Sequence, residues 1–197
     1  SVYGMSATIQ RGDRQDKKML MQLGPIRHRY TAKERAQKQG IGHYIYPRFT
    51  RLVDLNPSEG KNPSDYYRII MQSELRNMQV VSDTIDCVKR GRTPVIMTKY
   101  KEHAQKLYDM LQGSADHVFL LQGGKSLKER SAIREQMAAV RADESIILVA
   151  IGQYVGEGFN YPRLDTMLLA MPISLEGNVE QHAGRLNRDY EGKKDAI

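Results

Sequence analysis

The sequence is poor in the residues that build several common kinds of site. Cys87 is the only cysteine among 197 residues, which excludes an internal disulfide and a cysteine-based zinc site and fits a reducing, cytoplasmic compartment. No apolar run approaches the roughly 20 residues of a membrane-spanning helix, and no secretory signal pattern is present, so we expect no membrane partner. No metal site is expected either, because the histidines stand singly at His28, His43, His103, His117 and His182.

The remaining composition is that of an ordinary globular protein, with 40% hydrophobic and 27% charged residues. The formal net charge of +7 is unevenly placed, because residues 1–60 carry 11 Lys and Arg against 5 Asp and Glu. Such a surplus indicates a polyanion partner, although basic solvated surfaces are also common. The chain starts at Ser1 and ends on what resembles the beginning of a strand, so we expect a piece of a longer protein.

From residue 64 onward, helical and strand patterns alternate. Apolar residues at helical spacing predict helices over 64–91, with a possible break, and around 104–111 and 126–140. Short apolar runs predict strands at 95–97, 118–121, 146–150 and 166–170. Continuous apolar strands that alternate with helices are typical of a mainly parallel sheet covered on both faces. We therefore predict an α/β fold, a three-layer sandwich with helices on both faces of the sheet.

The first 63 residues are less regular. Residues 11–18 have the composition of a charged loop, residues 31–40 of a short polar helix, and residues 56–63 of a loop. Residues 43–53 have strand composition, and Pro47 suggests an edge or a bulge. We interpret the aromatic side chains of that segment, Tyr44, Tyr46 and Phe49, as core or edge-strand residues rather than stacking platforms.

Ligands of such sheets bind beyond the carboxyl ends of the strands. Residues 122–125 follow a strand there and resemble the end of a phosphate-binding loop. The full loop needs a glycine where Phe119 stands, inside the strand, so we reject a nucleotide-kinase interpretation. A tight turn and a backbone contact to a polyanion both remain open. The longer loop of residues 152–160 contains three glycines, which permit close approach of a ligand to the backbone or simply form turns.

Residues 179–190 complete the pattern with a basic helix. At about 100° per residue, Val179, Ala183, Leu186 and Tyr190 share one side, whereas Gln181, Arg185 and Arg188 share the other. Two guanidiniums aimed outward together suit phosphate oxygens, and a solvated basic face is the alternative. Gly184 on the polar side leaves room for a ligand near the backbone.

Read together, these segments resemble the C-terminal RecA-like half of superfamily 2 helicases and translocases. Gln181-x-x-Gly184-Arg185-x-x-Arg188 resembles motif VI, residues 148–165 resemble motif V and the strand beyond it, and residues 94–98 resemble motif IV. Residues 4–8 resemble motif III, the Ser-Ala-Thr that closes the first RecA-like domain. Residues 21–25 resemble the interdomain connection of the branch with restriction-enzyme motor subunits and XPB-like helicases. Four motifs in order span essentially the whole chain.

The resemblance implies a domain division and a set of roles. Residues 1–40 would be the end of the first RecA-like domain and a connector, and residues 41–197 the second RecA-like domain. Arg185 and Arg188 would be arginine fingers, and Gln181 would position the nucleotide or couple the domains. ATP-binding residues would be Glu157, Gly158 and Asn160; nucleic-acid-binding residues would be Thr98, Gln122, Gly123 and Gln153; and coupling residues would be Ser6 and Thr8.

ATP and Mg²⁺ would be held mainly by the first domain, because this sequence contains neither Gly-x-x-x-x-Gly-Lys-Ser/Thr nor an acidic Mg²⁺-binding motif on a strand. The expected partners are therefore that N-terminal domain and a nucleic acid, DNA in the first place and RNA as an option. The chain alone is expected to be inactive as an ATPase. Asn160 stands where the family usually has Asp, and Ile151 where many members have Thr. A non-catalytic binding or interaction module with a degenerate helicase fold is therefore the alternative.

Overall fold

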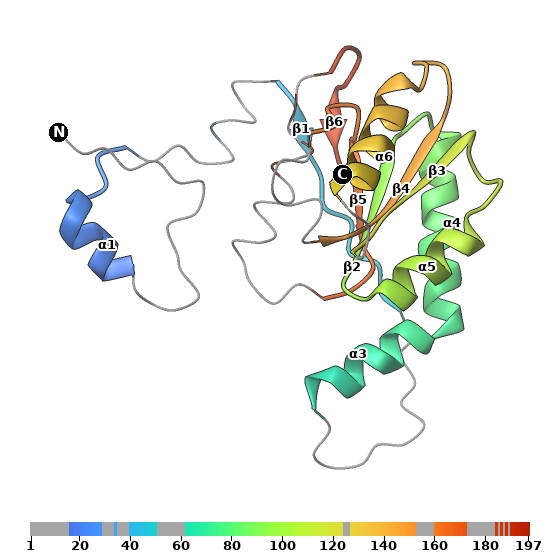
Figure 1. Cartoon of the computed structure of the whole chain (residues 1–197), viewed down its shortest axis with the longest axis horizontal. Coiled ribbons are helices and arrows are strands. Elements are labelled where there is room, and N and C mark those ends of the chain that lie inside the picture. The colour runs from blue at the N-terminus through green and yellow to red at the C-terminus, as the bar shows by residue number, and fades with distance from the viewer. Residues whose placement is uncertain are drawn as a thin grey trace.

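The computed structural model describes residues 16–28, 34, 40–50, 62–123, 127–152, 160–172, 184, 186, 188 and 190–197. Its centre is a sheet of four strands: β2 (Pro94–Thr98), β3 (His117–Leu121), β4 (Ile146–Ile151) and β5 (Thr166–Leu169). Their spatial order is β3-β4-β2-β5, and all neighbours are parallel (Figure 1). Every residue of β2 and β4 is buried, because helices cover both faces of this sheet.

A two-stranded parallel sheet of β1 (Gly42–His43) and β6 (Asp195–Ala196) continues the main sheet beyond β5. The Ile197 N–H donates to the Asp165 carbonyl at 2.9 Å, and the Ile197 carbonyl accepts from the Met167 N–H at 2.7 Å. Arg92, which precedes β2, fastens this junction. Its Nη1 donates to Asp195 at 2.7 Å and its Nε to the Thr166 hydroxyl at 2.5 Å.

Helices α4 (Glu74–Lys89) and α5 (Lys101–Met110) cover one face of the sheet, and α6 (Leu127–Ala139) covers the other. The alternation of side chains along the strands divides the core accordingly. Ile96, Ile147 and Val149 pack against Leu107 of α5 on one face. On the opposite face the core contains Met137 of α6 and Leu186, together with Val95, Leu148 and Leu164.

Helix α3 (Pro63–Gln72) projects from below the carboxyl edge of the sheet and meets α4 at a break on Ser73 (Figure 1). Pro63 suits the first turn of α3, and the Asp65 carboxylate accepts the Asn62 backbone N–H at 3.1 Å. Ser73 has extended backbone angles and separates the two helices. Helix α1 (Asp16–Leu23) stops at Gly24, whose φ of 81° lies in the left-handed region that favours glycine.

The structure confirms the α/β fold class, the four strands, and the broken helix pair over 64–91. The predicted loop at 11–18 is wrong in its second half, because Asp16 begins α1. The strand predicted at 43–53 is wrong for residues 44–50, whereas His43 does lie in β1 and residues 51–53 lie outside the described residues. After the Tyr44 N–H donates to Ala196, the described segment to residue 50 joins no ladder, since β6 is only two residues long and Pro47 has no N–H to donate.

The interpretation of the aromatic residues in that segment as core or edge-strand residues is wrong as well. Tyr44, Tyr46 and Phe49 are exposed, Phe49 to 91%. Instead the segment is attached by Arg48, which forms a bidentate pair with Asp83 of α4 at 2.7 and 2.8 Å. The predicted helix at 31–40 falls largely outside the described residues. Within the described part of the chain, no helix has the length and apolar composition to cross a membrane.

Candidate functional site at the carboxyl edge of the sheet

The register of the parallel strands brings the ends of the predicted motifs to one edge. Thr98 of β2 pairs with Ile151 of β4, and Leu121 of β3 pairs with Ala150 of β4, one residue earlier. On the other side of β2, the Ala170 N–H donates to the Met97 carbonyl at 2.9 Å. The chain therefore leaves all four strands at the same level, where ligands of parallel α/β sheets bind.

Thr98 ends a buried chain of hydrogen bonds that runs away from this edge. Its hydroxyl lies 2.8 Å from His103 Nδ1, and His103 Nε2 lies 3.0 Å from Asn77 Oδ1. Asn77 Nδ2 donates to the Met71 carbonyl at 2.8 Å, next to the break between α3 and α4. Thr98, His103 and Asn77 are all buried. The chain thus links the end of β2 to the helix pair.

The direction of each bond in this chain follows from its Asn77 end. Because the Asn77 amide nitrogen donates to Met71, its oxygen accepts from His103 Nε2, which must carry the ring proton. The unprotonated His103 Nδ1 then accepts the Thr98 hydroxyl proton. Burial, and secondarily the charges of Arg76 and Lys106, lower the pKa of His103 to about 4, so this neutral tautomer persists at neutral pH.

This assignment changes what Thr98 offers to a ligand. The sequence analysis expects Thr98 to face the phosphates of a nucleic acid, but its hydroxyl proton points into the protein. A hydrogen bond from this turn to a phosphate oxygen would therefore come from groups other than the Thr98 hydroxyl, such as backbone N–H groups. The first turn of α5 has such groups, since no side chain caps its start at Tyr100.

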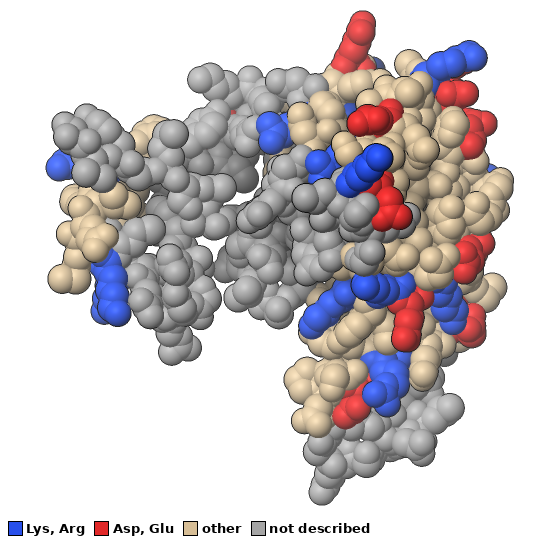
Figure 2. Space-filling view, in the orientation of Figure 1, with Lys and Arg blue, Asp and Glu red and all other residues tan. Residues whose placement is uncertain are grey.

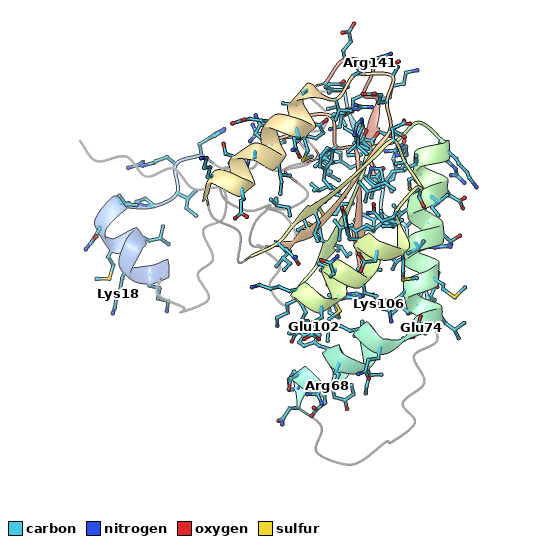
Figure 3. The ribbon with its side chains drawn as sticks, turned by 45° about the vertical axis from the view of Figure 1, so that its right-hand side comes forward. Lys18, Arg68, Glu74, Glu102, Lys106 and Arg141 are labelled. Carbon is cyan, nitrogen blue, oxygen red and sulfur yellow. The ribbon has the colours of Figure 1, made fainter. Side chains whose placement is uncertain are left out.

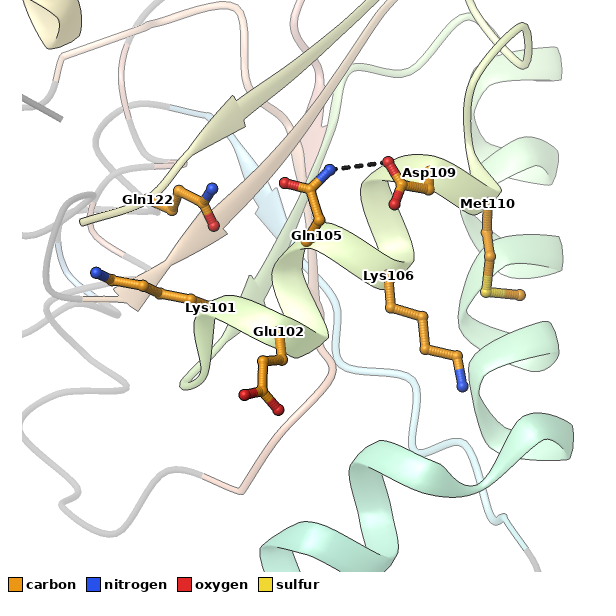
Figure 4. Close-up of a pocket in the computed structure, with 7 residues that line it drawn as sticks. All are labelled: Lys101, Glu102, Gln105, Lys106, Asp109, Met110 and Gln122. Carbon is orange, nitrogen blue, oxygen red and sulfur yellow. Dashed lines mark hydrogen bonds between the residues drawn. The ribbon is translucent and has the colours of Figure 1, made fainter. Parts of the chain in front are cut away.

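Gln122 follows β3 and lies beside α5, at an open depression of about 570 Å³ (Figure 4). Lys101 and Gln105 of α5 line it with Gln122, and Gln105 donates to Asp109 at 2.8 Å. The Gln122 Oε1 atom is buried and has no hydrogen-bond partner among the described residues. Gly123 is buried next to it. Gln122 is therefore at the predicted edge, with one polar atom unsatisfied.

A cluster of aromatic and basic side chains lies next to the end of β2. The sequence analysis did not predict it. The Lys99 ammonium lies 4.4 Å from the ring centroid of Tyr67 and 5.8 Å from that of Tyr100. The two rings are 6.0 Å apart and inclined by 56°. The sequence shows Lys99 and Tyr100 side by side, but it does not show that Tyr67 joins them. Tyr67 belongs to α3, more than 30 residues before Lys99.

Charged side chains of both signs lie on the face of the molecule that Figure 2 shows. Figure 3 shows Lys106 on α5 next to Glu74 on α4, and their ion pair measures 2.6 Å. Arg68 on α3 and Glu102 on α5 are exposed. Among the described residues, no three His, Cys, Asp or Glu side chains gather closely enough to hold a metal ion.

The segment that resembles motif VI is described at three positions. Gly184 and Leu186 are helical, and Leu186 is buried in the core, as its place on the apolar stripe predicts. Arg188 lies in a bend rather than on the helix, and Tyr190 is 41% exposed, so the predicted helix ends before both of them. The physical reason is the turn at residues 190–192, where Gly192 has a φ of 81° and directs the chain into β6.

Two features of this segment suit a ligand. A β-carbon at Gly184 would meet no atom within 4 Å, and its φ is not in the left-handed region, so neither packing nor backbone conformation requires glycine there. Arg188 Nε is buried without a hydrogen-bond partner among the described residues. Asn160, beyond the loop that follows β4, is exposed. The other predicted site residues lie outside the described residues: Ser6, Thr8, Gln153, Glu157, Gly158, Gln181 and Arg185.

The sequence comparisons find relatives of low identity. No family model matches the chain. It is 27% identical over 117 residues to transcript termination protein A18 of Fowlpox virus (strain NVSL), covering 58% of this chain and 24% of the relative. It is 24% identical over 137 residues to the protein of the same name from Myxoma virus (strain Lausanne), covering 67% and 28%. The chain thus spans about a quarter of the length of these relatives.

Among solved structures, that of T4 UvsW superposes with a TM-score of 0.55 and 22% sequence identity, over 70% of this chain and 27% of UvsW. At this identity the likeness shows a shared fold. The chain therefore has the RecA-like α/β fold, and the resemblance read from the motifs is confirmed at the level of fold.

Proposed function

We propose that this chain is the C-terminal motor half of an ATP-dependent nucleic-acid helicase or translocase. In this proposal residues 1–40 end the first RecA-like domain and connect it to the second, which comprises residues 41–197. The first domain holds ATP and Mg²⁺, and the second supplies arginine fingers and part of the track for the nucleic acid. The viral relatives are called transcript termination proteins, which makes a nucleic-acid substrate the natural expectation.

The observation that carries this proposal is the register of the four parallel strands. It brings the carboxyl ends of the four strands to one edge, at Thr98, Leu121, Ile151 and Leu169, in a fold shared with T4 UvsW. The sequences at these ends resemble the strand-binding and nucleotide-binding motifs of superfamily 2. An unrelated α/β domain with the same strand count would have no reason to combine these motifs at one edge.

The described part of motif VI supports a phosphate ligand. Arg188 Nε is a buried charged donor without an acceptor among the described residues, and leaving such a donor unpaired costs on the order of 1–3 kcal/mol. A phosphate oxygen from the facing domain would satisfy it. Gly184 would let that ligand approach the backbone without a side chain in the way. In hydrolysis the guanidiniums of Arg185 and Arg188 would neutralise charge on the transferring phosphoryl group, an effect of about 10³–10⁵ in rate. Mg²⁺, bound with the nucleotide, would neutralise the neighbouring phosphate oxygens.

The strand-binding edge would hold the nucleic acid mainly through its phosphates. Backbone N–H groups at the start of α5, Gln122, and the exposed Lys99 and Lys101 are the groups available there. Contacts of this kind do not depend on sequence and weaken with salt. We expect the 197-residue chain to bind single-stranded oligonucleotides of different sequence equally, with an affinity that falls linearly in log–log plots against salt. Anisotropy titrations between about 50 and 200 mM salt measure this affinity, and salt-independent or absent binding would contradict the proposal.

A binding module without motor activity is the second candidate, favoured by two observations. Asn160 and Ile151 replace residues that the family uses toward ligands, and the Thr98 hydroxyl donates inward. ATP hydrolysis by the full-length protein distinguishes the two functions. Turnover stimulated by nucleic acid supports the motor, whereas nucleic-acid binding without turnover supports the module.

A further inference from the structure

We propose that Tyr67, Lys99 and Tyr100 form a cradle for one nucleotide of a single-stranded nucleic acid, in which a base stacks on a tyrosine ring and Lys99 pairs with the phosphate. This inference rests on the proposed function and adds to it, because the track described above contacts phosphates only. It assigns a role to α3, which the motifs do not cover.

The three side chains of the cradle converge from two elements. Lys99 and Tyr100 occupy the turn between β2 and α5, and Tyr67 comes from the middle of α3. The ammonium sits over the Tyr67 ring at 4.4 Å from its centroid, within reach of the Tyr100 ring. Lys99 is exposed, and no carboxylate of the described residues forms an ion pair with it. The cluster is therefore a cation on aromatic faces, beside the edge where the strand is expected.

A nucleotide would enter the cradle by replacing the contact between the Lys99 ammonium and the Tyr67 ring. An exposed cation–π contact changes an equilibrium by about 2- to 5-fold, whereas one base stacked on an aromatic side chain contributes about 5- to 150-fold. When a phosphate draws the Lys99 ammonium off the ring, the freed face accepts a base, and the stronger pair of contacts replaces the weaker one. Lysine on a flexible stem can move this far without a change in the backbone.

The hydrogen-bond chain behind the cradle fixes its geometry. Asn77 bonds the Met71 carbonyl at the end of α3 and, through His103, connects to Thr98, the residue before Lys99. Both sides of the cradle are thus tied to one buried network. Tyr67 and Tyr100 therefore keep their 6.0 Å separation in the free protein, so little ordering is needed when a base binds.

The test compares two ligands that carry the same number of phosphates: a thymidine oligonucleotide of about 16 nucleotides and its fully abasic counterpart. Wild-type chain should bind the thymidine strand at least about 5-fold more tightly. Tyr67→Leu should lose most of that preference while binding the abasic strand as wild type does. Tyr67→Phe should keep the preference, because the ring remains. Tyr66→Leu is the matched control, since Tyr66 is the exposed neighbour on the same helix.

A cooperative thermal unfolding transition establishes that each variant is folded. The comparison of the two strands on the wild-type chain tests the cradle without any variant. Equal affinity of wild type for both strands overturns the cradle and leaves the phosphate track intact. A preference that survives in Tyr67→Leu also overturns it. Failure to bind either strand overturns the proposed function together with the cradle.

Discussion

The buried Thr98–His103–Asn77 chain makes stability depend on pH in a way that can be calculated. The pKa of His103 is about 4 in the folded protein, against 6.5 for an unperturbed histidine. Above pH 6.5 the ring is neutral in both the folded and unfolded states, and the stability is complete. As pH falls from 6.5 toward 4, His103 becomes protonated in the unfolded state but stays neutral in the folded state. Stability is therefore lost over this window, by about 3 kcal/mol in total, at up to about 1.4 kcal/mol per pH unit.

Replacing His103 by leucine isolates this effect. At pH 7 the variant leaves the Thr98 hydroxyl and Asn77 Oδ1 without their buried partners, which should cost about 2–4 kcal/mol. It has no ring to protonate, so it should not lose the further stability that wild type loses on acidification. The free energies of unfolding of the two proteins should therefore converge as pH approaches 4.

Urea unfolding followed by far-ultraviolet circular dichroism at pH 7, 6, 5 and 4 measures both curves. Other shifted groups cancel in the difference. Burial raises the pKa of Asp165, which favours the folded state at low pH, and this carboxyl is present in both proteins. If wild type and His103→Leu lose stability in parallel from pH 7 to 4, the neutral tautomer assigned to His103 is wrong. The inward orientation of the Thr98 hydroxyl then falls with it.

Three further predictions follow from other parts of the structure. Gly184→Ala should leave the 197-residue chain equally stable, or more stable by up to about 1 kcal/mol in a thermal melt. The same change should lower ATP turnover of the full-length protein at least about 10-fold if a ligand approaches that backbone; full turnover would show that the space serves no ligand. Arg92→Ala should lower the free energy of unfolding by about 2–4 kcal/mol in urea titrations, because it leaves Asp165 and Asp195 without the Arg92 guanidinium. A loss below about 1 kcal/mol would show that the junction of β5 and β6 is stable without Arg92. The 197-residue chain should show no ATP hydrolysis above a buffer blank in a phosphate-release assay, since it has no phosphate-binding loop, and robust turnover would refute the division of labour between two domains.

Periodicity was sufficient for the regular part of the fold. Strands such as β4 are buried on both faces, so their sequences are continuous apolar runs that few other structures would tolerate. The turn at Gly113, with a φ of 77°, follows from the left-handed conformation that glycine favours, which is visible in the sequence. The strand predicted at 43–53 failed because pairing depends on a neighbour, and composition does not reveal that β6 offers only two residues.

The candidate site also has a part that the sequence predicts and a part that it does not. Placement of Thr98 and Gln122 at the carboxyl edge could be predicted, because it depends only on where strands end. The inward hydroxyl of Thr98 could not, since it depends on Asn77 and His103, which come from two different helices. The contact between Tyr67 and Lys99 could not be predicted for the same reason. Its partner Lys99 is remote in sequence, and a tyrosine at helical spacing is ordinarily interpreted as core.

The central claim is that this chain supplies arginine fingers to a nucleotide held by another domain. The most direct test is nucleic-acid-stimulated ATP hydrolysis by the full-length protein with Arg185→Ala and Arg188→Ala changed separately. We predict that kcat falls by about 10³-fold or more for at least one of them while oligonucleotide affinity stays at the wild-type value. Unchanged turnover in both variants would contradict the claim.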